Sequence, residues 1–259
     1  MNLHQLILTN NDCYKTGRTI TPKGIMVHST GANNPNLKRY VGPDDGLLGK
    51  NQYGNHWNQN TPDGHQVCVH GFIGKLANGS IATYQTLPWN MRGWHCGSGS
   101  KGSGNDTHIS FEICEDGLTN ASYFHAVYKE AVELCVYLCK QYGLTEKNVI
   151  CHSEGAKLGI ASNHGDVMHW FPRFGKSMDT FREDVRKGLV GTTAPTAFSV
   201  GNKVVLNGAV YADSYGGGKG RTFQNKVCTV TRIVDLKRKC PYLLDNSLGW
   251  VPKNSIRKA

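Results

Sequence analysis

Two of the eleven histidines stand at the ends of short apolar runs that are typical of β-strands. His28 closes the run Ile25-Met-Val-His, and His152 closes Val149-Ile-Cys-His. Because residues at strand ends face the loops at the edge of a sheet, we expect both imidazoles to point into a cleft there. Two neutral imidazoles with one carboxylate or thiolate form a three-ligand zinc site that leaves a position for water. The pattern therefore predicts a catalytic site for one Zn²⁺ ion.

Two carboxylates are candidates for the rest of this site. Asp166 follows His152 after a loop, and we expect it to be the third zinc ligand. Glu112 lies inside the apolar run His108-Ile-Ser-Phe-Glu-Ile-Cys. A glutamate within an apolar strand costs free energy unless it is paired or faces a polar cleft. Glu112 is therefore predicted to face the same cleft and to take part in proton transfer.

Strands that alternate with helices must position these groups. The helix predicted at 123–142 has apolar residues at the 3.6-residue period, with Gly143 as its stop signal. This alternation predicts an α/β domain with a mixed β-sheet flanked by helices. The predicted strands are 24–30, 67–73, 80–86, 108–114 and 148–152, and the second helix is 178–189.

Four motifs occur in a fixed order along residues 20–185: Ile25-Met-Val-His-Ser-Thr, Gly93-Trp-His-Cys-Gly, His108-Ile-Ser-Phe-Glu-Ile-Cys-Glu and Cys151-His-Ser-Glu. Together they resemble the type 2 N-acetylmuramoyl-L-alanine amidases, which include phage endolysins and share a fold with T7 lysozyme and the peptidoglycan recognition proteins. The resemblance implies cleavage of the amide bond between N-acetylmuramic acid and L-alanine in peptidoglycan. It also implies that His28 and His152 bind zinc and that Glu112 is the catalytic acid and base.

The loop that carries the third ligand departs from the family pattern. Relatives have Lys-x-Asp-Pro-Gly or Lys-x-Cys-Pro there, whereas this chain reads Asn163-His-Gly-Asp-Val-Met-His. Asp166 takes the place of the ligand, and His164 stands where a lysine is usual. We therefore expect His164 to act in catalysis as a donor to the oxyanion. His164 and His169 remain alternatives to Asp166 as the third ligand.

Three further residues are expected to contact the substrate. His70 lies near the position where relatives carry a tyrosine or histidine on a strand of the active site. Trp94 and His95 belong to the Gly93-Trp-His-Cys-Gly motif. The resemblance thus predicts substrate contacts from His70, Trp94 and His95.

The segment 191–197, Gly-Thr-Thr-Ala-Pro-Thr-Ala, is predicted to be a linker between a zinc amidase domain at 1–190 and a second domain at 198–259. Short strands are expected at 203–206, 209–212, 227–234, 242–244 and 249–252, with a flexible glycine loop at 216–218. This spacing is typical of a small all-β barrel. The segments 200–206 and 248–252 resemble bacterial SH3-like modules that bind cell walls.

Charge is concentrated in the second domain. The whole chain has a net charge of +10, with 29 basic and 19 acidic residues. Residues 191–259 contain eleven Lys or Arg and three Asp or Glu, which makes +8 and leaves 18 minus 16, or +2, for the rest. A basic domain favours a polyanionic partner. We expect anionic cell-wall polymers, and nucleic acid is the alternative polyanion that we do not expect it to bind.

The nine cysteines are expected to be mostly buried thiols, Cys68 included, because their number is odd and no CxxC pair occurs. A cysteine-dependent cell-wall peptidase that uses Cys96 and His95 is one alternative function. Neighbouring residues on a strand face opposite ways, which disfavours that pair. A peptidoglycan-binding protein without activity is the other alternative.

The N-terminal segment has neither a basic leader nor a long apolar stretch, and no run in the chain approaches the about eighteen apolar residues of a membrane span. We therefore expect a protein made in the cytoplasm without a signal peptide. It would act on the cell wall after release, in a phage or prophage context.

Overall fold

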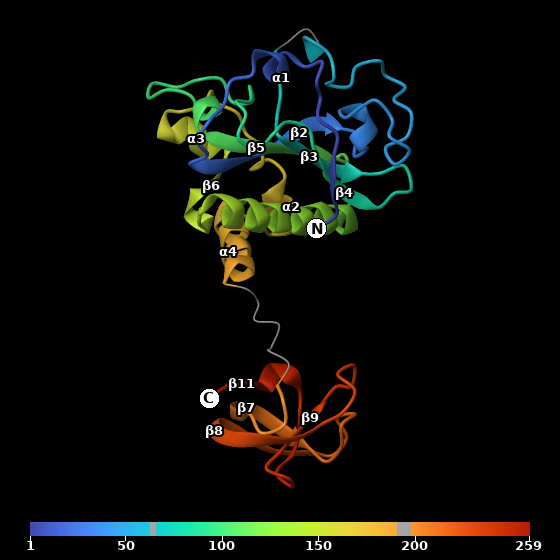
Figure 1. The fold of residues 1–259 in the computed structure, drawn as a ribbon, viewed down its shortest axis with the longest axis vertical. Coiled ribbons are helices and arrows are strands. Elements are labelled where there is room, and N and C mark those ends of the chain that lie inside the picture. The colour runs from blue at the N-terminus through green and yellow to red at the C-terminus, as the bar shows by residue number, and fades with distance from the viewer. Residues whose placement is uncertain (63–65, 191–197) are drawn as a thin grey trace. The chain divides into compact units, whose positions relative to one another are not determined.

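The computed structural model describes residues 1–62, 66–190 and 198–259, and the predicted linker 191–197 lies outside these residues. The chain divides into two compact units, Met1–Val190 and Gly191–Ala259 (Figure 1). None of the helices in the described ranges is long and apolar enough to cross a membrane.

A six-stranded mixed sheet forms the centre of the first unit, in the order β1-β4-β3-β5-β2-β6. The β3–β4 pair is antiparallel and the other neighbours are parallel. The mixed sheet with flanking helices confirms the predicted fold class. The strands are β1 (Leu3–Gln5), β2 (Gly24–Asn33), β3 (Gly71–Lys75), β4 (Ile81–Gln85), β5 (His108–Glu115) and β6 (Val149–Cys151); the helices are α1 (Asp12–Thr16), α2 (Ala121–Tyr142), α3 (His152–Leu158) and α4 (Met178–Leu189).

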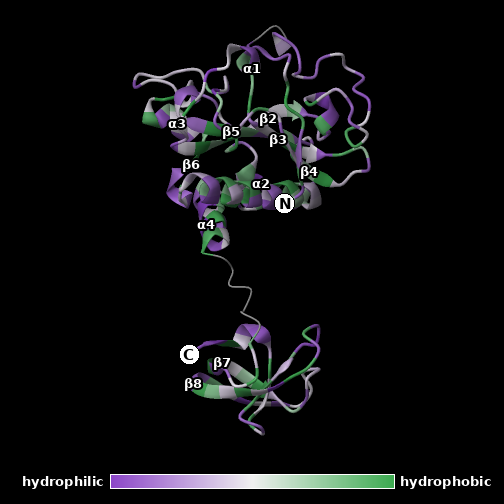
Figure 2. Cartoon of the chain, in the orientation of Figure 1, coloured by the Kyte–Doolittle hydropathy of each residue, from purple (hydrophilic) through white to green (hydrophobic). Residues whose placement is uncertain are grey.

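Helices α2 and α4 cover one face of this sheet (Figure 1). Apolar residues of β2 and β5, such as Ile25, Val27 and Phe111, alternate toward this face and pack with α2 in the larger core. A smaller core on the other face contains Leu37 and Phe72. Hydrophilic residues are concentrated in the loops around the sheet (Figure 2). Because both faces are covered, the central strands are apolar on both sides except where polar side chains form a cleft.

Helix α2 has clear signals at both ends. The side chain of Asn120 accepts a hydrogen bond from the backbone N–H of Tyr123, and Gly143 ends the helix with φ 65°. A left-handed residue at this position is best supplied by glycine, because it has no Cβ atom. Helix α2 therefore begins two residues before the predicted start at 123 and ends at Tyr142 as predicted, and α4 has its predicted bounds.

Two predicted strand boundaries were wrong at points that matter for the site. The strand expected at 67–73 begins only at Gly71, and Cys68 instead forms an isolated antiparallel bridge with Trp94. His152 was expected to end a strand, but β6 stops at Cys151 and His152 is the first residue of α3. Short elements with weak sequence patterns, β1, α1 and α3, were not predicted.

The second unit is a small antiparallel barrel. Its strands are β7 (Lys203–Tyr211), β8 (Lys219–Ile233), β9 (Tyr242–Leu244), β10 (Gly249–Val251) and β11 (Ile256–Lys258), with a 3₁₀ turn at Lys253–Ser255. The order is β10-β9-β8-β7-β11, and a further pairing of β10 with β7, between Trp250 and Tyr211, closes the ring. The segments 203–206 and 209–212, expected as separate strands, belong mainly to the single strand β7. The small all-β barrel itself is confirmed.

A disulfide joins Cys13 of α1 to Cys68, across 55 positions of sequence. This corrects the expectation that Cys68 is a buried thiol. The other seven cysteines are free and buried. The pairing could not be read from the sequence because neither cysteine belongs to a recognisable motif. The bond fastens α1 to the segment around Cys68, which also pairs with Trp94 through an isolated β-bridge.

We expect the Cys13→Ser/Cys68→Ser double variant to lose about 2–4 kcal/mol of unfolding free energy, because the disulfide restricts the unfolded chain. Urea unfolding of the full chain measures this loss. Reductant should lower the stability of the unaltered protein and leave that of the double variant unchanged. Equal stability of the two proteins under oxidising conditions would contradict the prediction.

Candidate active site

The register of β2 with β5 brings His28 beside Glu112. The strands are parallel, and His28 is directly paired with Glu112. Both side chains lie on the face opposite α2, because Val27 and Phe111, their neighbours along the strands, belong to the core beneath that helix. The predicted histidine and glutamate therefore share one cleft.

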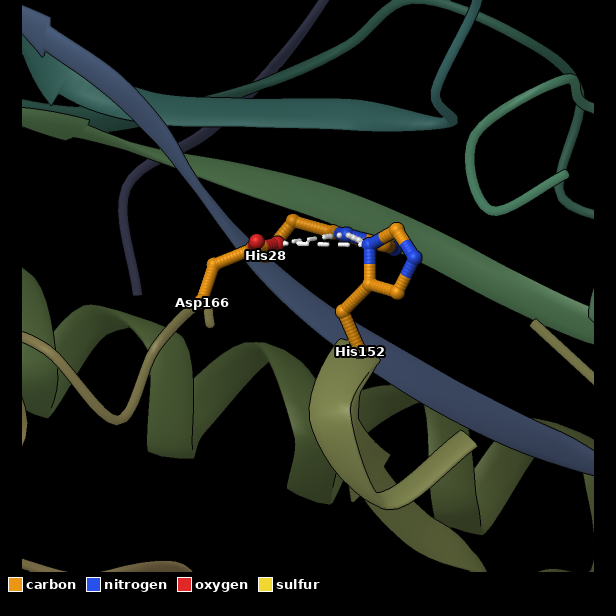
Figure 3. Close-up of side chains that lie close together, drawn as sticks. All are labelled: His28, His152 and Asp166. Atoms are coloured by element: carbon orange, nitrogen blue, oxygen red, sulfur yellow. Dashed lines mark hydrogen bonds and ion pairs between the residues drawn. The ribbon is translucent and has the colours of Figure 1, made fainter. Parts of the chain in front are cut away.

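Three side chains converge at this point: His28 from β2, His152 from the start of α3 and Asp166 from the following loop (Figure 3). The Nδ1 atom of His28 lies 3.0 Å from Oδ2 of Asp166 and 3.2 Å from Nδ1 of His152. The third side of this triangle, from Nδ1 of His152 to Oδ2 of Asp166, is 3.5 Å. Both histidines are buried, and Asp166 is partly buried.

The spacing of these three atoms suits one zinc ion. Ligand atoms about 2.0–2.2 Å from a tetrahedral zinc ion lie roughly 3.3–3.6 Å from one another. The observed separations of 3.0, 3.2 and 3.5 Å are close to that range. One ion could thus contact all three side chains after small adjustments and keep a fourth position free.

The outer ring nitrogens of the two histidines have their own partners. Nε2 of His28 is 3.0 Å from Nδ1 of His95, and Nε2 of His152 is 3.3 Å from Oγ of Ser162. If each Nε2 carries the proton and donates it to its partner, each Nδ1 directs a lone pair toward Asp166. Three electron-rich atoms would then face one another, an arrangement that a cation stabilises. The donor set fits a metal ion.

Charge and burial favour the forms that bind metal. Burial lowers the pKa of His28, so its imidazole is neutral over a wide pH range. Burial alone would raise the pKa of Asp166, but the close approach of the His152 and His28 rings outweighs burial and lowers that pKa. The site therefore offers a neutral imidazole from His28 and a carboxylate from Asp166.

Glu112 is held in a different electrostatic setting. Burial raises its pKa well above the usual value, and the negative charges of Asp166 and Glu115 add to the rise. A cation between the predicted ligands would lower that pKa again. Its Oε2 atom is covered and has no hydrogen-bond partner among the described residues. A carboxyl group with an uncommitted oxygen beside a metal site is suited to accept and return a proton.

A cavity of about 700 Å³ opens over this cluster. Trp57, Val67, Val69 and Trp94 line one part of it, and Glu112 and the three predicted ligands line another, together with His164 and His169. The cavity thus joins an apolar wall to a polar, titratable centre, as expected for a site that binds a substrate of mixed polarity.

The two alternative ligands, His164 and His169, lie in different surroundings. His164 is exposed, and its ring stacks on that of His152 with a centroid distance of 4.7 Å. His169 turns away from the metal cluster, and its Nε2 atom lies 2.8 Å from Oε1 of Glu115. Neither belongs to the group of three whose ligand atoms converge in the described part of the chain. Asp166 is the carboxylate that completes the triangle.

The three residues that were expected to contact the substrate differ in burial and in their position relative to the cavity. Trp94 is exposed on the cavity wall, and His95 lines the cavity while it bonds to His28. His70 does not line this cavity and is fully buried. Its Nδ1 atom accepts a hydrogen bond from the backbone N–H of Ser110, and its Nε2 atom lies 2.8 Å from the carbonyl oxygen of Met91. With both nitrogens occupied, His70 is unavailable to a substrate.

Three residues that the sequence did not single out support the site. Oδ1 of Asn105 accepts backbone hydrogen bonds from His95 and Cys96, which fixes the segment that carries His95. Oγ of Ser162 contacts the outer nitrogen of His152. Glu115 is buried and accepts from the backbone N–H of Gly31 as well as pairing with His169. Glu115 ends one of the four sequence motifs, whereas Ser162 carried no signal.

Comparison with known proteins then identifies the family. A model of the N-acetylmuramoyl-L-alanine amidases matches residues 18–167, more than half of the chain, and this range contains His28, Glu112, His152 and Asp166. The chain belongs to the N-acetylmuramoyl-L-alanine amidase family. It is also 36% identical over 70 residues to the N-acetylmuramoyl-L-alanine amidase CwlA of a Bacillus species, a match that spans 27% of this chain and 28% of that protein.

Solved structures share the amidase fold. The solution structure of the PlyG catalytic domain is 25% identical and matches with a TM-score of 0.51, covering 76% of this chain and 100% of that domain. The Staphylococcus aureus hydrolase AmiA, solved in complex with its ligand, is 18% identical with a TM-score of 0.51, covering 76% and 86% of the two chains. A mutant form of PlyL is 22% identical with a TM-score of 0.51, covering 73% and 100%.

The burial of His70 makes stability depend on pH. Burial lowers its pKa to about 4. An unfolded histidine takes up a proton near pH 6.5. The contribution of His70 to the free energy of unfolding is therefore fully present above about pH 6.5 and is lost as the pH drops toward 4. We expect the protonation of His70 to lower the free energy of unfolding by roughly 3 kcal/mol over this range. Urea unfolding at several pH values measures the slope.

The His70→Gln variant should have a shallower pH slope than the unaltered protein. Replacement of His125, which is exposed on α2, serves as the control and should leave the slope unchanged. An unchanged slope in the His70 variant would contradict the assignment.

Proposed function

We propose that the first unit is a zinc-dependent amidase that cleaves the bond between N-acetylmuramic acid and the L-alanine of the stem peptide. The convergence of His28, His152 and Asp166 beside Glu112 in one cavity is the observation that carries this proposal. Membership of the amidase family supports the reaction class. The arrangement matches a metal-assisted hydrolysis, which needs no covalent intermediate.

His28, His152 and Asp166 would hold the ion. A zinc ion bound there supplies a Lewis acid that lowers the pKa of water to about 7 and polarises a carbonyl group. His95 keeps the ring of His28 in place through its contact with Nε2, and Ser162 does the same for His152. Such outer contacts set the orientation and basicity of the ligands.

Glu112 would move the protons. Its uncommitted Oε2 atom accepts a proton from the attacking water and later donates one to the amine of the departing L-alanine. One carboxyl group can do both because it starts and ends each cycle in the same state. The strand register holds it beside His28 throughout.

His164 would stabilise the oxyanion. Its ring is exposed at the cavity, stacked on His152, where a ring N–H can donate to the oxygen of a tetrahedral intermediate. Trp94, also exposed on the cavity wall, would contact the substrate. The stacking gives His164 a defined position without making it a ligand.

The alternative mechanism through Cys96 lacks the necessary thiolate. Burial raises the pKa of Cys96 to about 11. Its Sγ atom lies 3.5 Å from Oδ1 of Asn105, while the neighbouring His95 directs Nδ1 toward His28. A nucleophilic cysteine requires a lowered pKa and a base within hydrogen-bond reach, and the geometry favours the metal mechanism.

The second unit would hold the enzyme on the wall. Its small barrel agrees with the SH3-like resemblance of segments 200–206 and 248–252, and its charge of +8 favours anionic wall polymers. The substrate would be bacterial peptidoglycan, reached after release from the cell in a phage or prophage lysis context. Attachment and catalysis would then be separate properties of the two units.

We expect the purified chain to contain one zinc ion and the Asp166→Ala variant to contain almost none, because three ligands are needed for a stable site. Metal analysis after gel filtration measures both. A chelator should abolish cleavage, and added zinc should restore it. The Asp106→Ala variant is the control, since Asp106 pairs with Arg92 outside the metal cluster. Zinc loss in His169→Ala with full retention in Asp166→Ala would contradict the ligand set.

We expect Glu112→Gln to retain zinc but to lower kcat by about 10²–10⁴-fold, because the amide keeps the shape of the side chain and cannot accept the proton. Release of new N-terminal amines from purified peptidoglycan measures the rate. Glu183→Gln, which alters an exposed carboxylate on α4, is the matched control.

Two outcomes would count against this function. Undiminished cleavage by Glu112→Gln would remove its proposed role. Binding of peptidoglycan fragments by the unaltered zinc-loaded protein without any release of amines would favour the inactive binding protein.

A further inference from the structure

The barrel of the second unit contains a groove of about 480 Å³ that the amidase mechanism does not use. Tyr211 of β7 and Trp250 of β10 lie side by side across the pairing that closes the barrel, and both line the groove half-buried. Aromatic rings in such a position offer faces to the C–H groups of a sugar or polyol. The groove is thus a concave part of the barrel surface, outside its packed core.

The polar groups of this groove are cationic or neutral. Arg232 is exposed and lines the groove. Asn246 and Ser247 are exposed at the rim and can bond to hydroxyl groups. No carboxylate is among the described lining residues. An anionic ligand would meet attraction and hydrogen bonds there, without a like charge to oppose it.

A second cation lies next to the aromatic wall. Nζ of Lys239 is 5.6 Å from the ring centroid of Tyr211, and Lys239 is exposed. The loop that carries it is fixed to the turn after β7, because Arg238 donates a hydrogen bond to Oγ of Ser214 and stacks on Tyr215. Lys239 therefore lies at the ring of Tyr211, and Arg232 lines the groove to which Tyr211 and Trp250 belong. Their charge belongs to a unit of +8 overall.

We propose that this groove binds a phosphodiester polymer of the cell wall, with the polyol or sugar over Tyr211 and Trp250 and phosphates at Arg232 and Lys239. The inference rests on the proposed attachment of the second unit to the wall and names its ligand and its site. A flexible polyol phosphate chain can enter a concave groove. A nucleic acid duplex presents its phosphates on a convex surface and is the less suitable polyanion.

Titration of the full chain with purified glycerol-phosphate polymer tests the groove. We expect the Arg232→Gln/Lys239→Gln variant to bind at least about tenfold more weakly, because it loses two hydrogen-bonding charges. The Arg257→Gln/Lys258→Gln variant removes the same charge from the exposed strand β11, and its affinity should fall by less than about threefold because distant surface charges are screened.

Each other outcome would overturn the proposal: absence of polymer binding, equal weakening in both double variants, or groove-dependent binding of a DNA fragment in place of the polymer. Cleavage of a soluble muramoyl-peptide is measured on the same proteins and should be unchanged in both variants. Failure of that cleavage in the unaltered protein would refute the amidase function while the polymer titration still decides the groove. Unfolding curves confirm that the variants are folded.

Discussion

The parallel register of β2 with β5 is the constraint on which the site depends. It pairs His28 with Glu112, so the proposed metal ligand and the proposed proton-transfer group stand side by side on one face of the sheet. The opposite face of the same strands is packed against α2, which prevents a slip of the strands. A shift of either strand by one residue would turn its side chain, His28 or Glu112, into the apolar core. The core thus determines the geometry of the cleft.

Beside this rigid pair, the third predicted ligand comes from a loop. Three residues that follow Asp166 are buried in the core: Val167, Trp170 and Phe171. His169 of the same loop bonds to Glu115 at the end of β5. These anchors explain how a loop without the family's Pro-Gly can still present a carboxylate to two histidines. An exposed loop held at several points combines an accessible site with the precision that metal binding requires.

The two units differ in net charge, and under the proposed function they would also differ in role. The first carries +2 and lines its cavity with five histidines and two carboxylates, whereas the second carries +8 on a small barrel. Under the proposed function, the positive charge of the second unit would raise the concentration of the enzyme at an anionic wall by electrostatic attraction. Attachment and hydrolysis would then be assigned to different units of the chain.

The sequence by itself determined much of the architecture. Apolar periodicity and the glycine stop predicted α2 and α4 and the central strands, because local patterns and helix caps act over a few residues. His28, Glu112, His152 and Asp166 could be selected in advance from motifs and residue chemistry. Tertiary structure alone decided which of the remaining histidines face the cavity, since burial and partners depend on residues far apart in sequence. It buried His70 against Ser110, turned His169 to Glu115 and joined Cys13 to Cys68.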